Sequence, residues 1–313
     1  MFDIIGRRAW WYLLSTCLIV PGVIGLLTGG LSAGIDFTGG SLLQMRFAQA
    51  ATQDGVDRAV RALGYDEAVV QTTQEGAVLI RLRALEPEQK TALVNGLVER
   101  LGAGEELGFS AIGPVVGAEL TRGAIVAVAA ASALILLYIT WAFRRMEHPV
   151  RYGAAAVIAL VHDSLFLLGL FALLGRFGGV QIDALFVTAV LTVIGFSVND
   201  TIVVFDRIRE NRRAQVVLPE ATRPSYVATV NYSVNQSLTR SINTSLTAIF
   251  VLLALLLLGG ATLRDFVLAL TVGFIVGTYS SVFNAACLVV SWEQGDLPRA
   301  WGWLRGRMAL RRR

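Results

Sequence analysis

One acidic side chain lies inside a long apolar segment of the chain. Asp200 falls within residues 191–205, which are otherwise rich in aliphatic side chains, and the arginines come only after it. A carboxylate near the centre of a membrane helix costs about 2.5 to 3.5 kcal/mol, so an acid that persists there usually faces protein or water and has a function. We therefore predict that Asp200 takes up and releases a proton within a membrane.

Arg240, near the start of a later apolar segment, is the expected partner of Asp200. A cation at a similar depth would hold the acid ionised until a proton arrives or the pair separates. Two interpretations are open: a static buried ion pair that fixes helix packing, and a pair that titrates. Amide side chains near both residues favour titration, because a static pair does not need them and water access would explain them; they are Asn199, Asn235, Gln236 and Asn243.

Further polar residues are expected to support the relay. Asn199 and Thr201 flank Asp200, and Asn243 follows Arg240. His162 and Asp163 lie near the middle of another apolar segment. Such a couple serves as often to hydrogen-bond two helices as to relay protons, so both roles stay open.

Six apolar runs are each near the length of about 20 residues that a membrane helix needs. Hydrophobic residues make up 55% of the 313 residues. The runs cover residues 11–31, 124–143, 153–174, 183–205, 241–260 and 266–290. We predict a polytopic α-helical membrane protein with six transmembrane helices. The first run is long for the apolar core of a signal peptide, so we expect it to be retained as an anchor.

The arginines predict the orientation of these helices, because basic residues of short loops stay on the cytoplasmic side. Arginines precede the first run, lie between the second and third, follow the fourth and fill the C-terminal tail. The opposite short loops hold only Arg176 and Arg264. Both termini are therefore predicted to be cytoplasmic.

Residues 32–122 interrupt the apolar pattern and are predicted to form one extracytoplasmic domain. Hydrophobic periodicity gives the order βαββαβ, which is typical of the ferredoxin-like α+β fold. Strands are expected at residues 41–47, 68–73, 77–83 and 107–112, and helices at 52–63 and 87–101. The remaining parts are a cytoplasmic N-terminus with the first span (1–31), the other five spans (123–292) and a basic cytoplasmic tail (293–313).

The sequence argues against an enzyme. Its single lysine, Lys90, lacks the glycine-rich context of a phosphate-binding loop, so no ATPase site is expected. It has no His-Glu-x-x-His and no Cys-x-x-Cys motif, so no metal site is expected either. We predict a chain without a cofactor, for which protons are the coupling ion.

Two segments together resemble the SecF family, whose members are the smaller partners of SecD in the bacterial protein-export machinery. One is GIDFTGG at residues 34–40, and the other is VIGFSVNDTIVVFDRIREN at residues 193–211. Residues 160–163 and 235–245 resemble further parts of the family. The resemblance implies a six-span subunit of the bacterial cytoplasmic (inner) membrane that forms half of a transporter of the resistance-nodulation-division class.

The resemblance also implies roles and partners. Asp200 matches the relay aspartate of the family and Arg240 its arginine in the fifth span. The signature after the first span is interpreted as structural, since glycines allow close backbone approach and an Asp can cap a turn; it comprises Gly34, Asp36, Phe37, Gly39 and Gly40. The implied partners are a SecD-like subunit, a SecYEG-type translocation channel, translocating polypeptides and membrane lipids, with no nucleic acid. Residues 215–225 form a longer connection than is usual in the family.

Three functions are open. The favoured one is an auxiliary subunit of protein export that uses the proton-motive force, through Asp200 and Arg240, to assist polypeptide translocation. A proton-coupled exporter of small molecules or lipids would share the relay, but exporters of that class usually carry larger paired outer domains. In a membrane scaffold, the third alternative, the polar residues would be purely structural.

Overall fold

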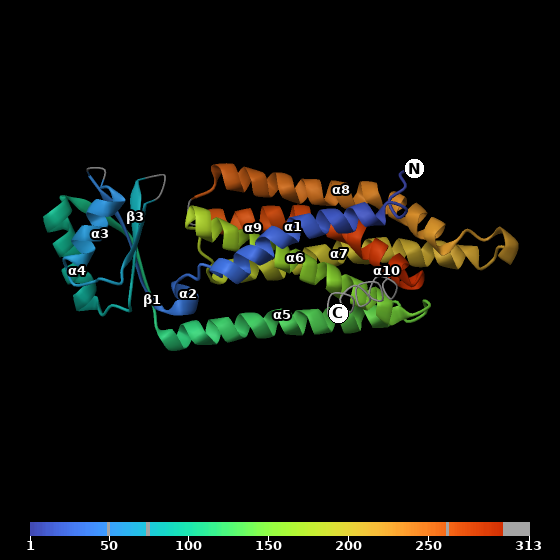
Figure 1. Ribbon diagram of the computed structural model, residues 1–313, viewed down its shortest axis with the longest axis horizontal. Helices are drawn as coiled ribbons and strands as arrows, with labels where there is room; N and C mark the ends of the chain where they lie inside the picture. Colours follow the sequence, from blue (N-terminus) through green and yellow to red (C-terminus); the bar gives the residue numbers. More distant parts are fainter. Residues whose placement is uncertain (49–50, 73–75, 261–262, 297–313) are drawn as a thin grey trace, which may run out of the picture. The chain divides into compact units, whose positions relative to one another are not determined.

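The computed structural model describes residues 1–48, 51–72, 76–260 and 263–296 (Figure 1). Within these residues six helices are long and apolar enough to cross a membrane, which is the predicted number. They are α1 (Arg8–Gly29), α5 (Pro114–Ala142), α6 (Pro149–Gly178), α7 (Ala184–Gln215), α8 (Tyr226–Leu258) and the continuous helix formed by α9 (Arg264–Tyr279), a π-helical turn (Ser280–Ala285) and α10 (Ala286–Glu293). Most of the predicted C-terminal tail lies outside the described residues.

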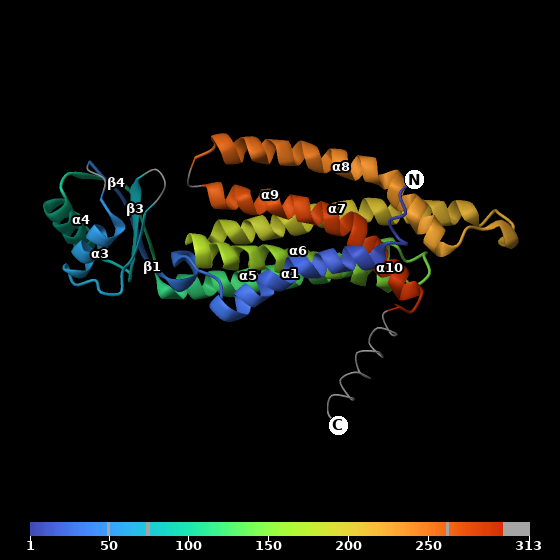
Figure 2. The same ribbon diagram turned by 45° about the horizontal axis from the view of Figure 1, so that its top comes forward.

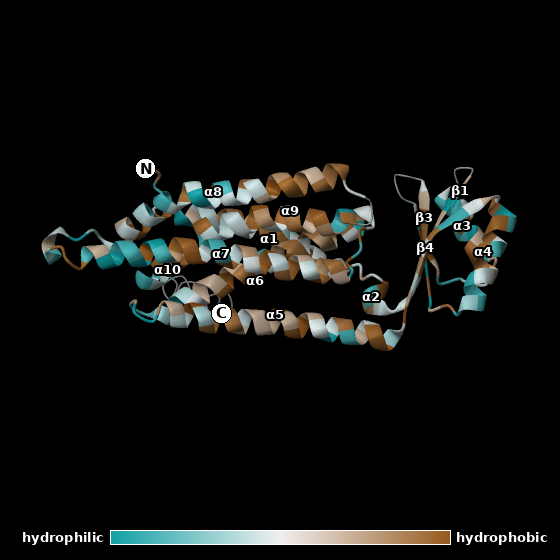
Figure 3. Ribbon diagram, turned by 180° about the vertical axis from the view of Figure 1, so that it is seen from behind, coloured by the Kyte–Doolittle hydropathy of each residue, from teal (hydrophilic) through white to brown (hydrophobic). Residues whose placement is uncertain are grey.

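Several of these helices are longer than the apolar runs that predicted them. Helix α7 continues through a charged stretch to Gln215, and α8 begins at Tyr226 rather than at residue 241. Arg and Glu are good helix formers, and ion pairs one turn apart, such as Arg207 with Glu210, support the extension. Figure 3 shows these hydrophilic helix ends beside the hydrophobic middle parts of the same helices.

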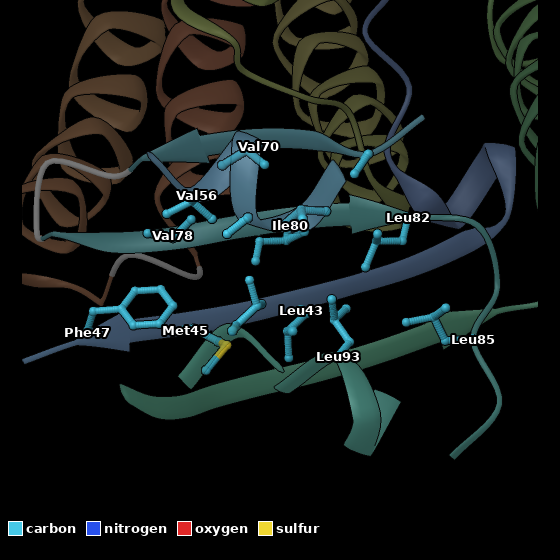
Figure 4. Packing of buried hydrophobic residues seen from close by; sticks show 14 residues of the cluster. Leu43, Met45, Phe47, Val56, Val70, Val78, Ile80, Leu82, Leu85 and Leu93 are labelled. Carbon is cyan, nitrogen blue, oxygen red and sulfur yellow. The ribbon is translucent and has the colours of Figure 1, made fainter. Parts of the chain in front are cut away.

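A four-stranded antiparallel sheet with two helices forms the small domain between α1 and α5. Its elements are β1 (Gly40–Phe47), α3 (Gln53–Arg61), β2 (Val69–Thr72), β3 (Ala77–Leu82), α4 (Pro87–Leu101) and β4 (Gly104–Ile112), and the strand order is β2-β3-β1-β4. Alternate residues of the strands point to one face, where Leu43 and Ile80 pack with Val56 and Leu93 of the helices (Figure 4).

By its internal contacts the chain divides into two compact units. One contains Met1–Gly30, Ala127–Leu173 and Phe186–Arg313, and the other contains Leu31–Val126 and Leu174–Leu185. The second unit thus includes the turn between α6 and α7 as well as the sheet.

Within the first unit, helices approach closely where they carry small residues. A Cβ atom on Gly22 of α1 would lie 2.7 Å from the Cα of Gly169 on α6, so the two backbones are in contact at this point. Helix α8 runs beside α9 (Figure 2). The buried face of α8 carries a small polar residue at every fourth position, namely Thr229, Ser233, Ser237, Ser241 and Ser245.

Candidate functional site

Asp200 is buried on α7, with 3% of its surface exposed. The hydroxyl groups of Ser241 and Ser245 on α8 approach its carboxylate. Even so, Oδ2 of Asp200 and Oγ of Ser241 are both buried and make no hydrogen bond within the described part of the chain. A buried oxygen without a donor is costly. Either a proton on Oδ2, donated to a serine oxygen, or a turn of the Ser241 hydroxyl toward Oδ2 would remove that cost.

Arg240 does not form an ion pair with Asp200. Its side chain is exposed, and no nitrogen of Arg240 lies within 4 Å of a carboxylate oxygen among residues 1–48, 51–72, 76–260 and 263–296. Its charge acts on Asp200 only over a longer distance. Ser241, the next residue, and Ser245, one turn further along α8, approach Asp200 instead.

The other residues expected beside Asp200 occupy different positions. Thr201 is buried, but its hydroxyl donates to the carbonyl of Ser197 one turn earlier, at 3.1 Å. Asn199 and Asn243 are exposed on the outer faces of α7 and α8. The structure therefore brings Asp200 together with Ser241 and Ser245, which the sequence analysis did not single out.

A second acid, Asp163 on α6, is completely buried and fully hydrogen-bonded. Its Oδ2 accepts from Ser197 Oγ at 2.6 Å and from Ser280 Oγ at 2.8 Å. Its Oδ1 lies 3.0 Å from Nδ1 of His162. These contacts connect α6 with α7 and with the sixth span. The two acids therefore differ: both oxygens of Asp163 have donors, whereas Oδ2 of Asp200 has none among the described residues.

The π-helical turn Ser280–Ala285 supplies part of this network. Ser280 bonds Asp163, and the hydroxyl of Ser281 donates to the carbonyl of Ser197 at 2.7 Å. Such a turn inserts an extra residue into a helix and is often found at functional sites. Polar residues in an otherwise apolar span were the available signal in the sequence, but their spacing did not reveal the turn.

The signature segment, residues 34–40, is joined to the start of α7 by hydrogen bonds of the backbone. The N–H of Gly34 donates to the carbonyl of Ile182 at 2.8 Å, and the N–H of Ile182 donates to the carbonyl of Ser32 at 2.9 Å. Oδ2 of Asp36 accepts from the N–H of Ala184, the first residue of α7, at 2.7 Å. A negative side chain at this position accepts from an N–H group of the first helical turn and interacts favourably with the positive end of the helix dipole.

Two glycines of the signature have conformations that other residues rarely adopt. Gly39 has φ +72° and Gly40 has φ +123°. A Cβ atom would lie 2.9 Å from the Cα of Pro114 at the first position and 2.5 Å from the carbonyl oxygen of Leu82 at the second. The chain therefore turns tightly into β1 beside the start of α5, and both positions require glycine.

Two further contacts surround the signature. The carbonyl oxygen of Phe37 lies 2.8 Å from where a Cβ of Gly117 on α5 would be. The guanidinium of Arg81 on β3 reaches the carbonyl of Ala33 at 3.5 Å, and its partial burial lowers the pKa of Arg81 from its ordinary value. The signature residues Gly34, Asp36, Phe37, Gly39 and Gly40 thus contact backbone groups of the neighbouring elements, and the structural role of the signature stays a prediction.

Comparison with known protein families identifies the chain's relatives. Residues 96–295 match the model for the C-terminal part of the protein export membrane proteins SecD and SecF, and residues 24–51 match the SecD/SecF GG motif. The chain belongs to this SecD/SecF family. The GG motif contains the junction with α7, and the longer match contains Asp163, Asp200 and Arg240.

Individual relatives cover almost the whole chain. Protein translocase subunit SecF of Thermobaculum terrenum is 49% identical over 311 residues, which is 96% of each chain. The SecF subunit of Anaerolinea thermophila is 40% identical and covers 95% of this chain and 96% of its own. Among solved structures, SecDF of Thermus thermophilus, described as a translocon-associated membrane protein, matches with a TM-score of 0.81 and 35% identity. That match covers 94% of this chain and 39% of SecDF.

Proposed function

We propose that the chain is a proton-driven auxiliary subunit of protein export and that Asp200 carries the proton. The main support is the buried Oδ2 of Asp200, which has no donor in the part of the chain that the structure describes and lies near a serine hydroxyl that is also unpaired there. Protonation would let Asp200 donate to α8, and release of the proton would restore a charge between α7 and α8. The names of the relatives, protein translocase subunits, support export as the process.

The available energy is sufficient for such a role. A charge that crosses 100 mV releases about 2.3 kcal/mol, and each pH unit adds about 1.36 kcal/mol. One proton can therefore shift a conformational equilibrium more than tenfold. The coupling needs no cofactor and no nucleotide.

The exposed face of α8 supports a second membrane subunit as partner. Arg240 and Asn243 are exposed on this helix, and apolar side chains such as Ile242 and Leu246 lie beside them. An arginine in contact with lipid tails is costly, so a partner with polar groups or water is needed at this position. A SecD-like chain fits this position. The match covers only 39% of SecDF of Thermus thermophilus, so most of that protein lies outside the part that resembles this chain. A SecYEG-type channel and translocating polypeptides are the further partners of such a pair.

The small domain, ferredoxin-like in strand order and placed outside the cytoplasm, is the part that would act on the polypeptide. The junction at Asp36 connects the entrance of its first strand to the first turn of α7. Asp200 follows on the same helix after about 24 Å at 1.5 Å per residue. A change at Asp200 that moves α7 would thus be transmitted to the domain.

Export measured in inner-membrane vesicles tests the proposal. Asp200→Asn should reduce proton-stimulated export by about tenfold or more, whereas Asp206→Asn, an exposed acid six residues later on the same helix, should not. A protonophore should lower export by the native protein to the level of export by the Asp200→Asn variant. Undiminished export by an inserted Asp200→Asn variant would refute the proposal and favour a scaffold.

A further inference from the structure

Arginines gather around a cavity of about 200 Å³ at the end of the bundle where α7 and α8 extend beyond their apolar parts. Its lining comes from the loop between α5 and α6, the start of α6, the end of α7, the connection to α8, the start of α8 and the end of α10. Two lining side chains are glutamates, Glu147 and Glu293, and five are arginines, namely Arg145, Arg151, Arg212, Arg213 and Arg223. The cavity therefore carries net positive charge, which favours an anion as its ligand.

Three of these arginines lack an acidic partner within the described ranges of the chain. No carboxylate oxygen lies within 4 Å of Arg145, Arg213 or Arg223 among the residues that the structure describes. The guanidinium of Arg223 is held by the backbone instead: Nε donates to the carbonyl of Leu218 at 2.9 Å, and Nη2 donates to that of Val216 at 3.0 Å. Neutral carbonyls leave the charge of a guanidinium uncompensated, so it still attracts an anion.

The other two arginines are paired, but with carboxylates at the surface. Arg151 pairs with Glu293, and Nη2 of Arg212 lies 3.3 Å from Glu147, whose side chain is 76% exposed. The ring of Tyr226 lies 5.5 Å from the guanidinium carbon of Arg212 and supports it from another side. Such an exposed ion pair contributes only about 0 to 1 kcal/mol. A phosphate group accepts two hydrogen bonds from one guanidinium, so it can replace Glu147 as the partner of Arg212.

Two tyrosines of the lining offer a further hydrogen-bond donor. Oη of Tyr152 lies 2.9 Å from Oη of Tyr226. Only one of the two hydroxyls donates in this pair, so the hydrogen of the other has no acceptor in the described part of the chain. Tyr152 is 2% exposed, and its ring packs against Phe143 and Phe205 at centroid distances of 5.6 and 5.2 Å. A buried donor without an acceptor is costly, and an oxygen of a ligand in the cavity would accept from it.

Tryptophans place the cavity at the level of the lipid headgroups. Trp141, which is 62% exposed, lies in the last turn of α5 just before Arg145, and Trp292 precedes Glu293 on α10. Indole rings are enriched at the boundary between membrane and water. The arginines predict that this boundary is the cytoplasmic one, where the leaflet carries anionic lipids. Phospholipid phosphates are therefore the phosphate compounds present at this depth.

We propose that this cavity binds the phosphate of an anionic phospholipid headgroup from the leaflet at this end of the bundle. The unpaired guanidinium groups and the free tyrosine hydrogen donate to the phosphate oxygens, Arg212 exchanges Glu147 for the phosphate, and the acyl chains stay in the bilayer. A water molecule occupies about 30 Å³ in the liquid, so a cavity of about 200 Å³ has room for a phosphate group. The bound lipid connects the loop between α5 and α6 with the ends of α7 and α8.

Lipid binding by the full-length chain tests the proposal. The purified protein in detergent is titrated with phosphatidylglycerol, and native mass spectrometry gives the dissociation constant of the first bound lipid. Phosphatidylcholine has the same phosphodiester but also a cation that the arginines repel, so it should bind at least about tenfold more weakly. Inorganic phosphate at the same concentration should not displace phosphatidylglycerol, because it lacks the acyl chains that hold a lipid at the membrane.

Variants assign the binding to the cavity. Arg213→Gln should weaken the binding of phosphatidylglycerol about tenfold, since a charged donor to the phosphate is lost. Arg207→Gln is the control: it removes the same charge from the same helix, but Arg207 lies outside the lining of the cavity and pairs with Glu210. Glu147→Gln should strengthen binding about two- to fivefold, because Arg212 loses its competing carboxylate. A variant that merely unfolds cannot give this gain.

Three results would overturn the proposal. They are equal affinity for the two lipids, equal affinities of the Arg213→Gln and Arg207→Gln variants, and displacement of the lipid by inorganic phosphate, which would assign the cavity to a soluble phosphate compound. If Arg213→Gln does not fold, Glu147→Gln decides, and unchanged or weaker binding by that variant contradicts the proposal. The measurement needs no translocation, so its outcome is independent of the proposed role of Asp200.

Discussion

The carboxylate of Asp36 accepts a hydrogen bond of 2.7 Å from the N–H of Ala184, a residue 148 positions away. Asp36 belongs to the short helix α2 (Ile35–Thr38) that leads into β1, and Ala184 begins the helix that carries Asp200. Capping is usually local, but here a residue of the signature caps a distant helix. The signature therefore joins the entrance of β1 to the start of α7 and also forms a tight turn.

Asp36→Ala should remove the cap and destabilise the junction by about 0.5 to 2 kcal/mol. Asp36→Asn keeps an acceptor oxygen and should retain most of the stability, although it loses the favourable charge at the helix start, worth about 0.3 to 1 kcal/mol. Thermal unfolding and export should be measured for both variants. If Asp36→Ala matches the native protein in both thermal unfolding and export, the hydrogen bond neither stabilises the junction nor contributes to export.

Much of the architecture could be predicted from the sequence, because it depends on local patterns. Apolar run length gave six spans, and alternation gave the order of strands and helices. Long-range partners had no such signal: nothing near Asp36 indicates Ala184, and the π-helical turn at Ser280 changes the register of a span that otherwise looks regular. Depth alone did not indicate which side chains of α8 face Asp200. Neighbouring helix residues differ by about 100° in direction, so Ser241 and Ser245 approach the carboxylate while the side chain of Arg240 is exposed.

Arg240→Met should impair export without preventing insertion, because the cation on α8 would no longer act on Asp200 or on a partner subunit. Arg240→Lys should retain part of the function, since it keeps the charge. Arg207→Met is the control: this arginine pairs with Glu210 on the exposed extension of α7, and its loss should change export little. Vesicle export assays and membrane fractionation separate function from insertion. Normal export by Arg240→Met would remove Arg240 from the mechanism.

Gly40→Ala should destabilise the sheet domain by more than about 1 kcal/mol. The substitution places a Cβ 2.5 Å from the carbonyl of Leu82 and imposes a positive φ on a residue that disfavours it. Gly108→Ala on β4 is the matched control, because its Cβ would meet only the side chain of Gln44 at 3.9 Å. Limited proteolysis of the domain should show faster cleavage for the first variant alone.

Gly22→Leu should weaken the packing of α1 on α6, since its Cβ would lie 2.7 Å from the Cα of Gly169 and neither backbone can yield without separating the helices. We expect a lower thermal unfolding temperature in detergent, with insertion intact. A Cβ on Gly123 of α5 would meet nothing within 4 Å, so Gly123→Leu should leave the transition unchanged. If both variants unfold alike, the crossing of α1 and α6 is not close in the membrane.

Ser197 and Ser280 donate to the same oxygen of Asp163, from α7 and from the π-helical turn, and should therefore act as a unit. Removing one hydroxyl by Ser197→Ala or Ser280→Ala leaves the carboxylate with one donor on Oδ2 and should cost about 1.5 to 3 kcal/mol, the usual contribution of a hydrogen bond to a charged group. A double-mutant cycle on unfolding free energy measures the coupling, and we expect the combined loss to differ from the sum by at least about 0.5 kcal/mol. Ser132→Ala on α5 is the control, because its hydroxyl bonds only its own helix at Val128. Strictly additive losses would mean that the two serines hold Asp163 independently of each other.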